Sequence, residues 1–204
     1  MSRSALIYTA IAAIAIAVVS FVVTRDPARP LPATMENRAD LEGLRKGTMK
    51  KLAFHPVPKP VGKSAYVTET GGEATLADHA GKYVLLNFWA TWCAPCRKEM
   101  PMLSALQDEF GGDHFEVLTI ATGKNMPQAM EKFLSDINVT NLPLHRDPKS
   151  ALAREMAVLG LPVTLILSPD GHEIARMLGD ADWASDSARA IIRALIAPPT
   201  SVQQ

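Results

Sequence analysis

The chain has 204 residues, of which 48% are hydrophobic and 21% are charged, so it can bury the core of one domain with appendages or of two small domains at most. Lysine plus arginine equals aspartate plus glutamate at 21 each, which gives a formal net charge of zero. Because the sequence has no basic stripe and no aromatic residues interleaved with cations, nucleic-acid binding is not expected.

The N-terminal segment differs in composition from the rest of the chain. Residues 5–23, ALIYTAIAAIAIAVVSFVV, carry no charge and are long enough to cross a hydrocarbon layer of roughly 30 Å as a helix. A cleaved signal peptide is the main alternative, but the apolar sequence continues well past the alanines that resemble a cleavage site, Ala13, Ala15 and Ala17. We therefore predict an N-terminal transmembrane anchor over residues 1–24. The flanking positive charges are too balanced to fix its orientation.

Extended and turn-forming segments follow the anchor. Residues 25–50 are polar and contain prolines, which predicts a tether with a short amphipathic helix near 34–46. Residues 52–63 contain three prolines and are predicted to be extended. A glycine pair, Gly71-Gly72, lies between two short β-like runs and predicts a hairpin. The run YVLLNFWA, residues 83–90, is almost continuously apolar, which is typical of a strand covered on both faces.

Helices and strands then alternate to the end of the chain. We predict a helix at 94–110, a strand at 115–122, a helix at 126–137, a short strand within 142–147, a helix at 148–160, an antiparallel hairpin of 163–168 and 172–178, and a final helix at 182–197 with Asp182 as its N-cap. This order indicates a mixed α/β sheet with helices on both faces. It assigns residues 51–197 to one domain and residues 198–204 to a C-terminal tail.

Both cysteines of the chain lie in FWATWCAPCRKEMP, residues 88–101, between a predicted strand and a predicted helix. Disulfide exchange needs one thiolate that attacks and a second thiol near enough to close a ring on it. The free N–H groups and the dipole at a helix start stabilise an anion, and such positions lower a thiol pKa from about 8.5 into the range of roughly 3.5–7.5. We therefore predict that Cys93 is the nucleophile and that Cys96, one turn later, is the resolving thiol.

Other chemistries fit this cysteine pair less well. A structural zinc site needs four ligands, and the five histidines show no paired metal spacing, so no metal site is predicted. A structural disulfide across two residues would stabilise little. A peroxidase would have a proline seven places and a Thr or Ser three places before the reactive cysteine, where this chain has Leu86 and Ala90. A Cu(I)-binding chaperone using the same two thiols is the alternative from another class, since soft Cu(I) accepts two sulfurs.

The element order, with C-x-x-C at the end of the first long strand, resembles the thioredoxin fold. More narrowly, FWATWCAPCRKEMP, the upstream hairpin, GLPVTLILSPDG and the predicted anchor resemble the TlpA family of membrane-anchored, thioredoxin-like thiol:disulfide interchange proteins. The ending GHEIARMLGDADWAS is most similar to the protein for which that family is named. The resemblance covers roughly residues 50–197 and is silent on residues 24–50.

The resemblance implies a proton-transfer role for one carboxyl group. Glu99 lies three residues after Cys96, on the same helical face, and glutamates of this C-x-x-C-x-x-E arrangement relay protons to and from the second cysteine. An acidic residue is also common in the first turn of any helix, without such a role. Asn87 stands where thioredoxin has a buried aspartate, and an amide cannot titrate.

The resemblance also implies a surface that binds the substrate. Pro162 matches the cis-proline beside the active site of thioredoxin-like proteins, which would leave the backbone of Leu161 free to pair with an extended substrate segment. Trp92 and the two residues between the cysteines, Ala94 and Pro95, are expected to face the substrate.

These observations predict a thiol:disulfide oxidoreductase without a cofactor. The resemblance implies a single-pass protein of the inner membrane whose catalytic domain is periplasmic. It also implies reduction of disulfide-bearing clients in the maturation of cytochromes or of oxidase copper centres, with electrons from a membrane thiol carrier. The direction of electron flow rests on the resemblance alone, so an oxidant or an isomerase stays open.

Overall fold

The computed structural model describes residues 38–197, which comprise the whole of the predicted domain and the end of the predicted tether. The predicted anchor, residues 1–24, and the predicted tail, residues 198–204, lie outside this range. Between residues 38 and 197, every helix is too short or too polar to span a membrane.

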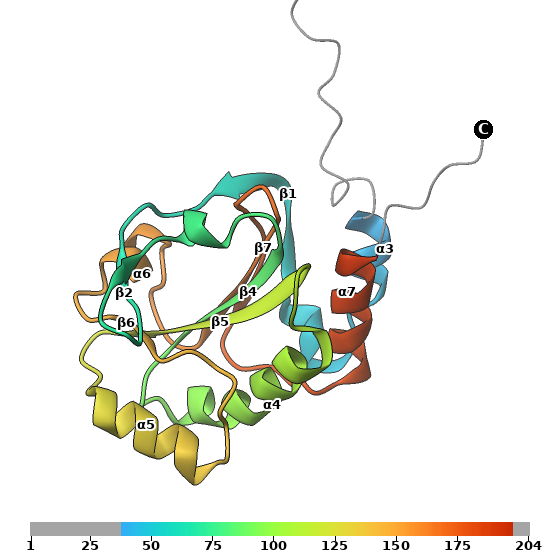
Figure 1. Cartoon of the computed structure of the whole chain (residues 1–204). Helices are drawn as coiled ribbons and strands as arrows, with labels where there is room; N and C mark the ends of the chain where they lie inside the picture. Colours follow the sequence, from blue (N-terminus) through green and yellow to red (C-terminus); the bar gives the residue numbers. More distant parts are fainter. Residues whose placement is uncertain (1–37, 198–204) are drawn as a thin grey trace, which may run out of the picture. The chain divides into compact units, whose positions relative to one another are not determined.

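Figure 1 shows the strands and helices of the described chain, which alternate between residues 83 and 167. The strands are β1 (Ala53–Pro60), β2 (Tyr66–Val67), β3 (Glu73–Ala74), β4 (Tyr83–Trp89), β5 (Phe115–Thr122), β6 (His145–Asp147), β7 (Val163–Leu167) and β8 (His172–Leu178). The helices are α3 (Arg38–Gly43), α4 (Ala94–Phe110), α5 (Pro127–Asp136), α6 (Ala151–Glu155) and α7 (Asp186–Ile196), with the short 3-10 helices η1 (Gly47–Lys51) and η2 (Leu76–His79). The eight strands form one sheet in the order β1-β8-β7-β4-β5-β6-β2-β3.

The centre of the sheet decides which loops meet. Strand β4 pairs in parallel with β5 and antiparallel with β7, so that Phe88 lies opposite both Ile120 and Val163. Parallel strands end at the same edge of a sheet, and an antiparallel neighbour begins there. The loops that follow β4 and β5 therefore meet the loop that precedes β7 at one edge. The cysteine pair lies at this edge because it directly follows β4.

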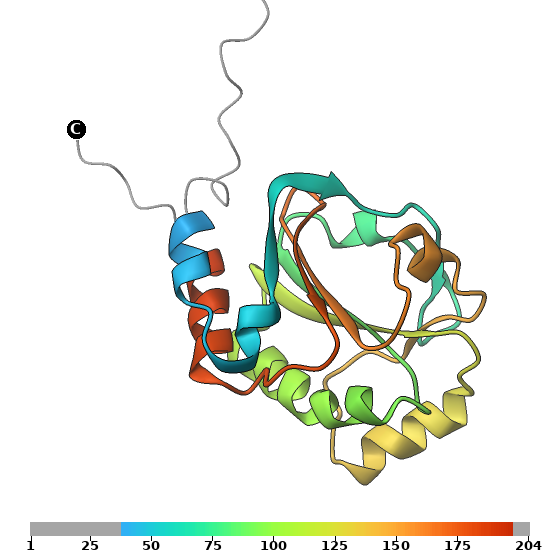
Figure 2. The same cartoon turned by 180° about the vertical axis from the view of Figure 1, so that it is seen from behind.

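Side chains alternate between the two faces of each strand and thereby form two cores. On β4, Leu85 and Trp89 pack into the larger core, whereas Leu86 and Phe88 pack into the smaller one. The larger core includes residues of α3, η1, α4, α5 and α7, and the smaller core includes residues of η2 and α6. Figures 1 and 2 show α4 and α5 together on one side of the sheet. Burial on both faces accounts for the continuous apolar sequence of β4.

The two hairpins predicted from glycine-containing turns are confirmed. Strands β2 and β3 pair antiparallel on either side of Gly71, and β7 and β8 pair antiparallel on either side of Gly171. Both glycines have positive φ, 87° and 76°, a backbone region that favours residues without a Cβ atom. The glycines therefore fix the positions of these turns.

The helix predicted at 148–160 is wrong in its limits, since only Ala151–Glu155 is helical. Ala157 adopts a left-handed φ of 53°, so the helix ends well before Gly160. At the other end, the carboxylate of Asp147 accepts hydrogen bonds from the backbone N–H groups of Ala151 and Ala153. The result is a short helix followed by a seven-residue connection to β7.

The start predicted for the last helix is also wrong. Helix α7 begins at Asp186, and its N-cap is Ser185, whose hydroxyl accepts a hydrogen bond from the Ala188 N–H. Asp182 caps a preceding turn instead, where its carboxylate accepts from the Ala184 N–H. Two capping residues compete within four positions, and sequence spacing alone does not rank them.

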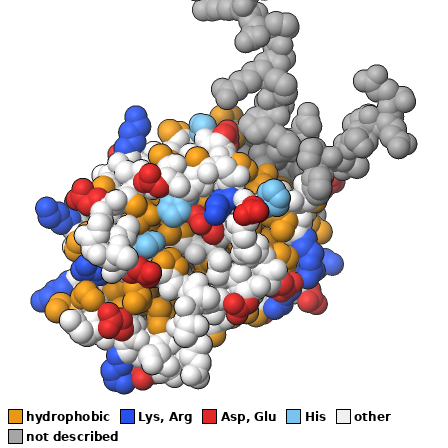
Figure 3. Space-filling model, in the orientation of Figure 1, with side chains coloured by type: hydrophobic (Ala, Val, Ile, Leu, Met, Phe, Trp, Pro, Cys, Tyr) orange, Lys and Arg blue, Asp and Glu red, His pale blue; other side chains and the backbone are white. Residues whose placement is uncertain are grey.

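Charges of both signs occur on the surface of the described residues. On the face drawn in Figure 3, acidic and basic side chains are interspersed around hydrophobic ones, and neither sign forms a continuous patch there. Five large hydrophobic side chains between residues 38 and 197 are nevertheless exposed, namely Val57, Trp92, Met126, Leu159 and Leu178.

Candidate functional site

The cysteine pair occupies the turn from β4 into α4. Cys93 is the N-cap of α4, and its Sγ accepts a hydrogen bond from the Cys96 N–H at 3.3 Å. The two residues form a disulfide. Cys93 is 6% exposed and Cys96 is fully buried, so the first sulfur lies nearer the surface. A backbone N–H that points at Sγ of Cys93 also stabilises negative charge on that atom when the disulfide opens.

A buried asparagine holds the loop that leads into the cysteines. Oδ1 of Asn125 accepts hydrogen bonds from the backbone N–H and the hydroxyl of Thr91, at 2.8 and 3.0 Å. Its Nδ2 donates to the Thr122 carbonyl at the end of β5, at 2.9 Å. These contacts join the loops that follow β4 and β5. Sequence reasoning missed Asn125, because its partner lies 34 positions away and no local motif marks the pair.

Glu99 is fully buried on α4, one turn after Cys96. Its Oε1 accepts hydrogen bonds from the Ala181 N–H and from Nε1 of Trp183, both at 2.9 Å, while Oε2 has no partner among the described residues. Burial raises the pKa of Glu99 to about 7, although the hydrogen bonds from Ala181 and Trp183 act in the opposite direction. A carboxyl with a pKa near neutrality can both accept and give up a proton under ordinary conditions.

The loop after β8 supplies both hydrogen-bond donors to the carboxylate of Glu99. Ala181 and Trp183 both belong to the connection between β8 and α7, more than 80 positions after the glutamate. Trp183 is buried, and its indole N–H donates its hydrogen bond to the carboxylate of Glu99. The sequence offered no signal for either partner.

Asn87 is also buried. Its Nδ2 donates a hydrogen bond to the hydroxyl of Thr164 on β7 at 2.9 Å. This neutral contact fixes the position of the amide side chain.

A cis peptide bond lies directly before the neighbouring strand, β7. The Leu161–Pro162 peptide is cis, and Pro162 immediately precedes Val163, the residue paired with Phe88. The Pro162 carbonyl accepts a hydrogen bond from the Gly179 N–H at 3.0 Å. Within residues 38–197, no backbone hydrogen bond engages Leu161. Its peptide groups are therefore available to an extended partner.

Exposed apolar side chains gather at the same edge of the sheet. Trp92, directly before Cys93, is 67% exposed, and Ala94 and Pro95 between the cysteines are exposed as well. Leu159, in the loop before the cis peptide, is 98% exposed. Met126 follows β5, and Leu178 is paired with Val163, so these exposed side chains also belong to this edge. Exposed apolar groups around a reactive centre indicate a protein-binding surface.

The described residues contain no group of three or more His, Cys, Asp or Glu side chains that could hold a metal ion. In this part of the chain, His, Cys, Asp and Glu side chains therefore add no third ligand to the two sulfurs of Cys93 and Cys96.

Comparisons with known proteins place these features in a family. The chain matches the model of the AhpC/TSA family over residues 56–175. It is 33% identical over 121 residues to the thiol:disulfide interchange protein HelX of Rhodobacter capsulatus, covering 59% of this chain and 62% of HelX. It is 31% identical over 109 residues to the thiol-disulfide oxidoreductase ResA of Bacillus subtilis, covering 53% of this chain and 60% of ResA. The matched region thus spans less than two thirds of each relative.

The fold is shared with a solved structure. A Chlorobium tepidum protein assigned as the thiol:disulfide interchange protein DsbE superposes with a TM-score of 0.61 at 24% identity, over 69% of this chain and 97% of that one. This likeness confirms the thioredoxin-like mixed sheet predicted from the sequence. Since the family model also covers more than half of the sequence, the chain belongs to the AhpC/TSA family.

Proposed function

We propose that the chain is a thiol–disulfide oxidoreductase that reduces disulfides of client proteins through Cys93 and Cys96. The observation that carries this proposal is the disulfide at the start of α4, with one sulfur near the surface and the other enclosed. The descriptions of HelX and ResA support the same chemistry. A peroxidase is not favoured, because the positions of the peroxidase pattern hold Leu86 and Ala90, two buried apolar residues.

The reaction proceeds by two exchanges at sulfur. In the reduced protein, the Cys93 thiolate attacks one sulfur of a client disulfide, forms a mixed disulfide with it and releases the other client sulfur as a thiolate. Cys96 then loses its proton and attacks Sγ of Cys93, which releases the second client thiolate and closes the Cys93–Cys96 disulfide. A dithiol donor reverses these steps and restores the pair. Two electrons pass from protein to client in each turnover.

Glu99 provides the proton transfer that the enclosed thiol needs. Cys96 is fully buried, so a thiolate formed there without a compensating positive charge or hydrogen bond has a high free energy. As a carboxylate, Glu99 accepts the Cys96 proton when the mixed disulfide is resolved. As a carboxylic acid, it returns a proton when the donor reopens the disulfide and Cys96 leaves. A pKa of about 7 keeps both forms of Glu99 populated near neutral pH.

Client proteins bind at the edge of the sheet that carries the cysteines. The peptide groups of Leu161, beside the cis bond, pair with an extended client segment. Trp92 with its exposed neighbours Ala94 and Pro95 contacts the client on the other side of Cys93. This arrangement places a client disulfide over Sγ of Cys93 rather than over Cys96.

Within this class of enzymes, we place the chain with the TlpA-like reductants. The motif FWATWCAPCRKEMP and the ending GHEIARMLGDADWAS support this placement. The clients would then be apoproteins of cytochrome maturation or of oxidase copper centres, and a membrane thiol carrier would supply the electrons.

The proposed activity predicts turnover in a disulfide-reduction assay. The full chain, supplied with a dithiol donor, should reduce insulin, and its reduced form should react with the small disulfide dithiobis(nitrobenzoate). The reduction potential of the pair, measured by equilibration with glutathione, should lie near −270 mV, about that of thioredoxin, because the proposed role is reductive. A potential near −120 mV, about that of a strong oxidant, would contradict the proposed direction. Stoichiometric Cu(I) without any disulfide exchange would instead favour a copper-binding role.

We further propose that residues 1–24 remain attached as a single membrane anchor of the inner membrane, with the catalytic domain in the periplasm. The uncharged run of residues 5–23 supports this proposal. Mass spectrometry of the protein from the membrane fraction should recover the N-terminal residues intact. Alkylation of intact cells with a membrane-impermeant maleimide, after reduction, should label Cys93. A soluble product that begins after Ala17 would contradict retention of the anchor.

A further inference from the structure

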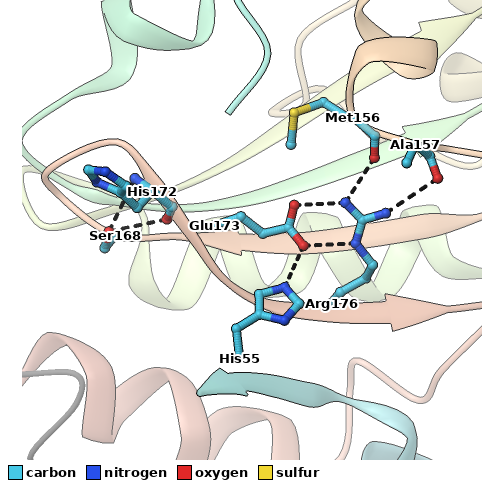
Figure 4. Close-up of polar contacts among 7 residues, drawn as sticks. All are labelled: His55, Met156, Ala157, Ser168, His172, Glu173 and Arg176. Atoms are coloured by element: carbon cyan, nitrogen blue, oxygen red, sulfur yellow. Dashed lines mark hydrogen bonds and ion pairs between the residues drawn. The ribbon is translucent and has the colours of Figure 1, made fainter. Parts of the chain in front are cut away.

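A buried ion-pair network lies beside the loop that leads to the cis peptide (Figure 4). Glu173 on β8 is 2% exposed, and its carboxylate accepts hydrogen bonds from Nε and Nη2 of Arg176 at 2.8 and 2.7 Å. Nε2 of His55, on β1, lies 2.6 Å from Oε1 of the same carboxylate. Burial opposes ionisation of Glu173, but the hydrogen bonds from Arg176 and His55 outweigh it and hold the pKa of Glu173 below its usual value. The guanidinium is thus fixed in one orientation.

A β-bulge makes this network possible. Residues three apart on a regular strand point to opposite faces, so Glu173 and Arg176 would ordinarily be separated by the sheet. In β8, however, Ala175 lies opposite Ile166 and Glu173 lies opposite Leu167, which leaves Ile174 as an extra residue. Ile174 and Ala175 accordingly both pack into the larger core. The bulge therefore turns Glu173 and Arg176 to the same face, the one covered by α6.

The guanidinium of Arg176 also contacts the backbone at the end of α6. Nη2 of Arg176 donates to the Met156 carbonyl at 2.8 Å, and Nη1 donates to the Ala157 carbonyl at 3.4 Å. Carbonyls at a helix end lack intrahelical partners and carry partial negative charge, which a cation stabilises. Ala157 has the left-handed φ of 53° that ends the helix. Arg176 therefore holds the backbone at the point where the loop of residues 157–161 begins.

We propose that Arg176 is a positioning residue for client binding, which fixes the loop of residues 157–161 so that Leu159 and the peptide groups of Leu161 face the client. This inference rests on the proposed function. The loop carries the most exposed large hydrophobic side chain of the described residues, Leu159, and ends at the cis bond. Its start is held by Arg176 and its end by the hydrogen bond between Pro162 and Gly179. Neither contact touches the cysteines, so client affinity and thiol chemistry are separable.

Two variants test the role of Arg176 without leaving the buried carboxylate of Glu173 unpaired. Arg176→Lys keeps a cation beside Glu173 but removes the planar fork of donors. The double variant Glu173→Leu with Arg176→Met removes the whole ion pair, a change that cores often tolerate. We expect the KM for insulin to rise by about tenfold in both variants, as when one charge-assisted hydrogen bond that orders a binding loop is lost. The kcat, the reduction potential and the rate with dithiobis(nitrobenzoate) should stay unchanged.

Arg189→Met is the matched control. Arg189 also contacts a carboxylate, that of Glu109 at 2.7 Å, and a backbone carbonyl, that of Ala184, but it lies on α7. This variant should keep the wild-type KM. A wild-type KM for insulin in both Arg176 variants, or an equal loss of reactivity with the small disulfide, would overturn the inference while leaving the proposed function intact. If the wild-type protein reduces neither disulfide, the proposed function and this inference both fail.

Discussion

Cys96→Ser should stop the reaction at the mixed disulfide. The variant keeps Cys93, with the backbone N–H of residue 96 aimed at its Sγ, so attack on a client disulfide remains possible. Without the second thiol, nothing inside the protein breaks the bond to the client. We expect nearly stoichiometric accumulation of client linked through Cys93, and loss of catalytic turnover by about 10³-fold or more. Non-reducing electrophoresis followed by mass spectrometry of the linked peptides measures both.

Cys93→Ser is the matched control for this trap. Cys96 is fully buried, so it should capture little client and should be alkylated more slowly than Cys93 in the reduced wild-type protein. Equal trapping by the two variants would contradict the assignment of nucleophile and resolving thiol, but not the class of reaction. If neither variant traps a client that is known to be present, the oxidoreductase proposal itself fails.

Glu99→Gln should slow the resolution of the mixed disulfide by on the order of 10²-fold at pH 7, the usual contribution of a positioned acid–base group. The wild-type rate of resolution should rise with pH through the pKa of Glu99, about 7, because the carboxylate is the form that accepts the Cys96 proton. Reopening of the disulfide by a donor should show the reverse trend, since it needs the protonated form. Stopped-flow exchange kinetics across this pH range should find both dependences lost in the variant.

The same substitution should change how stability depends on pH. The pKa of Glu99 is raised from 4.5 to about 7 in the folded protein, so the fold favours the protonated form. Its contribution is fully present below about pH 4.5 and is lost as the pH rises through about 7. Between these limits, the free energy of unfolding of the wild type should fall by up to about 3 kcal/mol relative to Glu99→Gln, as the shift implies. Urea unfolding at several pH values measures this difference.

Glu109→Gln is the control on the same helix. Glu109 pairs with Arg189 and Arg193 on the surface, which holds its pKa below the usual value. Its replacement should leave the exchange kinetics near pH 7 unchanged. A Glu99→Gln variant with the pH–rate profile of the wild type would show that Glu99 has no role in proton transfer.

The sequence alone was sufficient for the features that depend on local pattern. The continuous apolar run of β4 required cover on both faces, and the glycines at 71 and 171 placed two hairpins. The C-x-x-C spacing put the two cysteine residues about one helical turn apart, after the end of a buried strand. Each of these depends on residues within a few positions of one another, for which the backbone offers few alternatives.

Capping and helix length were less predictable. Ser185 rather than Asp182 caps α7, and α6 ends at Glu155 rather than at Gly160. At the start of α7, two residues with similar capping preferences compete. At the end of α6, Arg176 comes from a strand later in the sequence and donates a hydrogen bond to the Met156 carbonyl.

Only the tertiary structure decided the surroundings of the reactive groups. Glu99 could be placed beside Cys96 from spacing, but its raised pKa depends on burial and on Ala181 and Trp183, which fold back from more than 80 positions away. Strand pairing likewise brings Asn125 within hydrogen-bond distance of Thr91. It also produces the bulge that places Glu173 and Arg176 on the same face of the sheet. Sequence pattern specifies each element through short-range sterics and hydrophobic periodicity, whereas proton affinity and loop position depend on desolvation and on hydrogen bonds between elements that meet only in the folded chain.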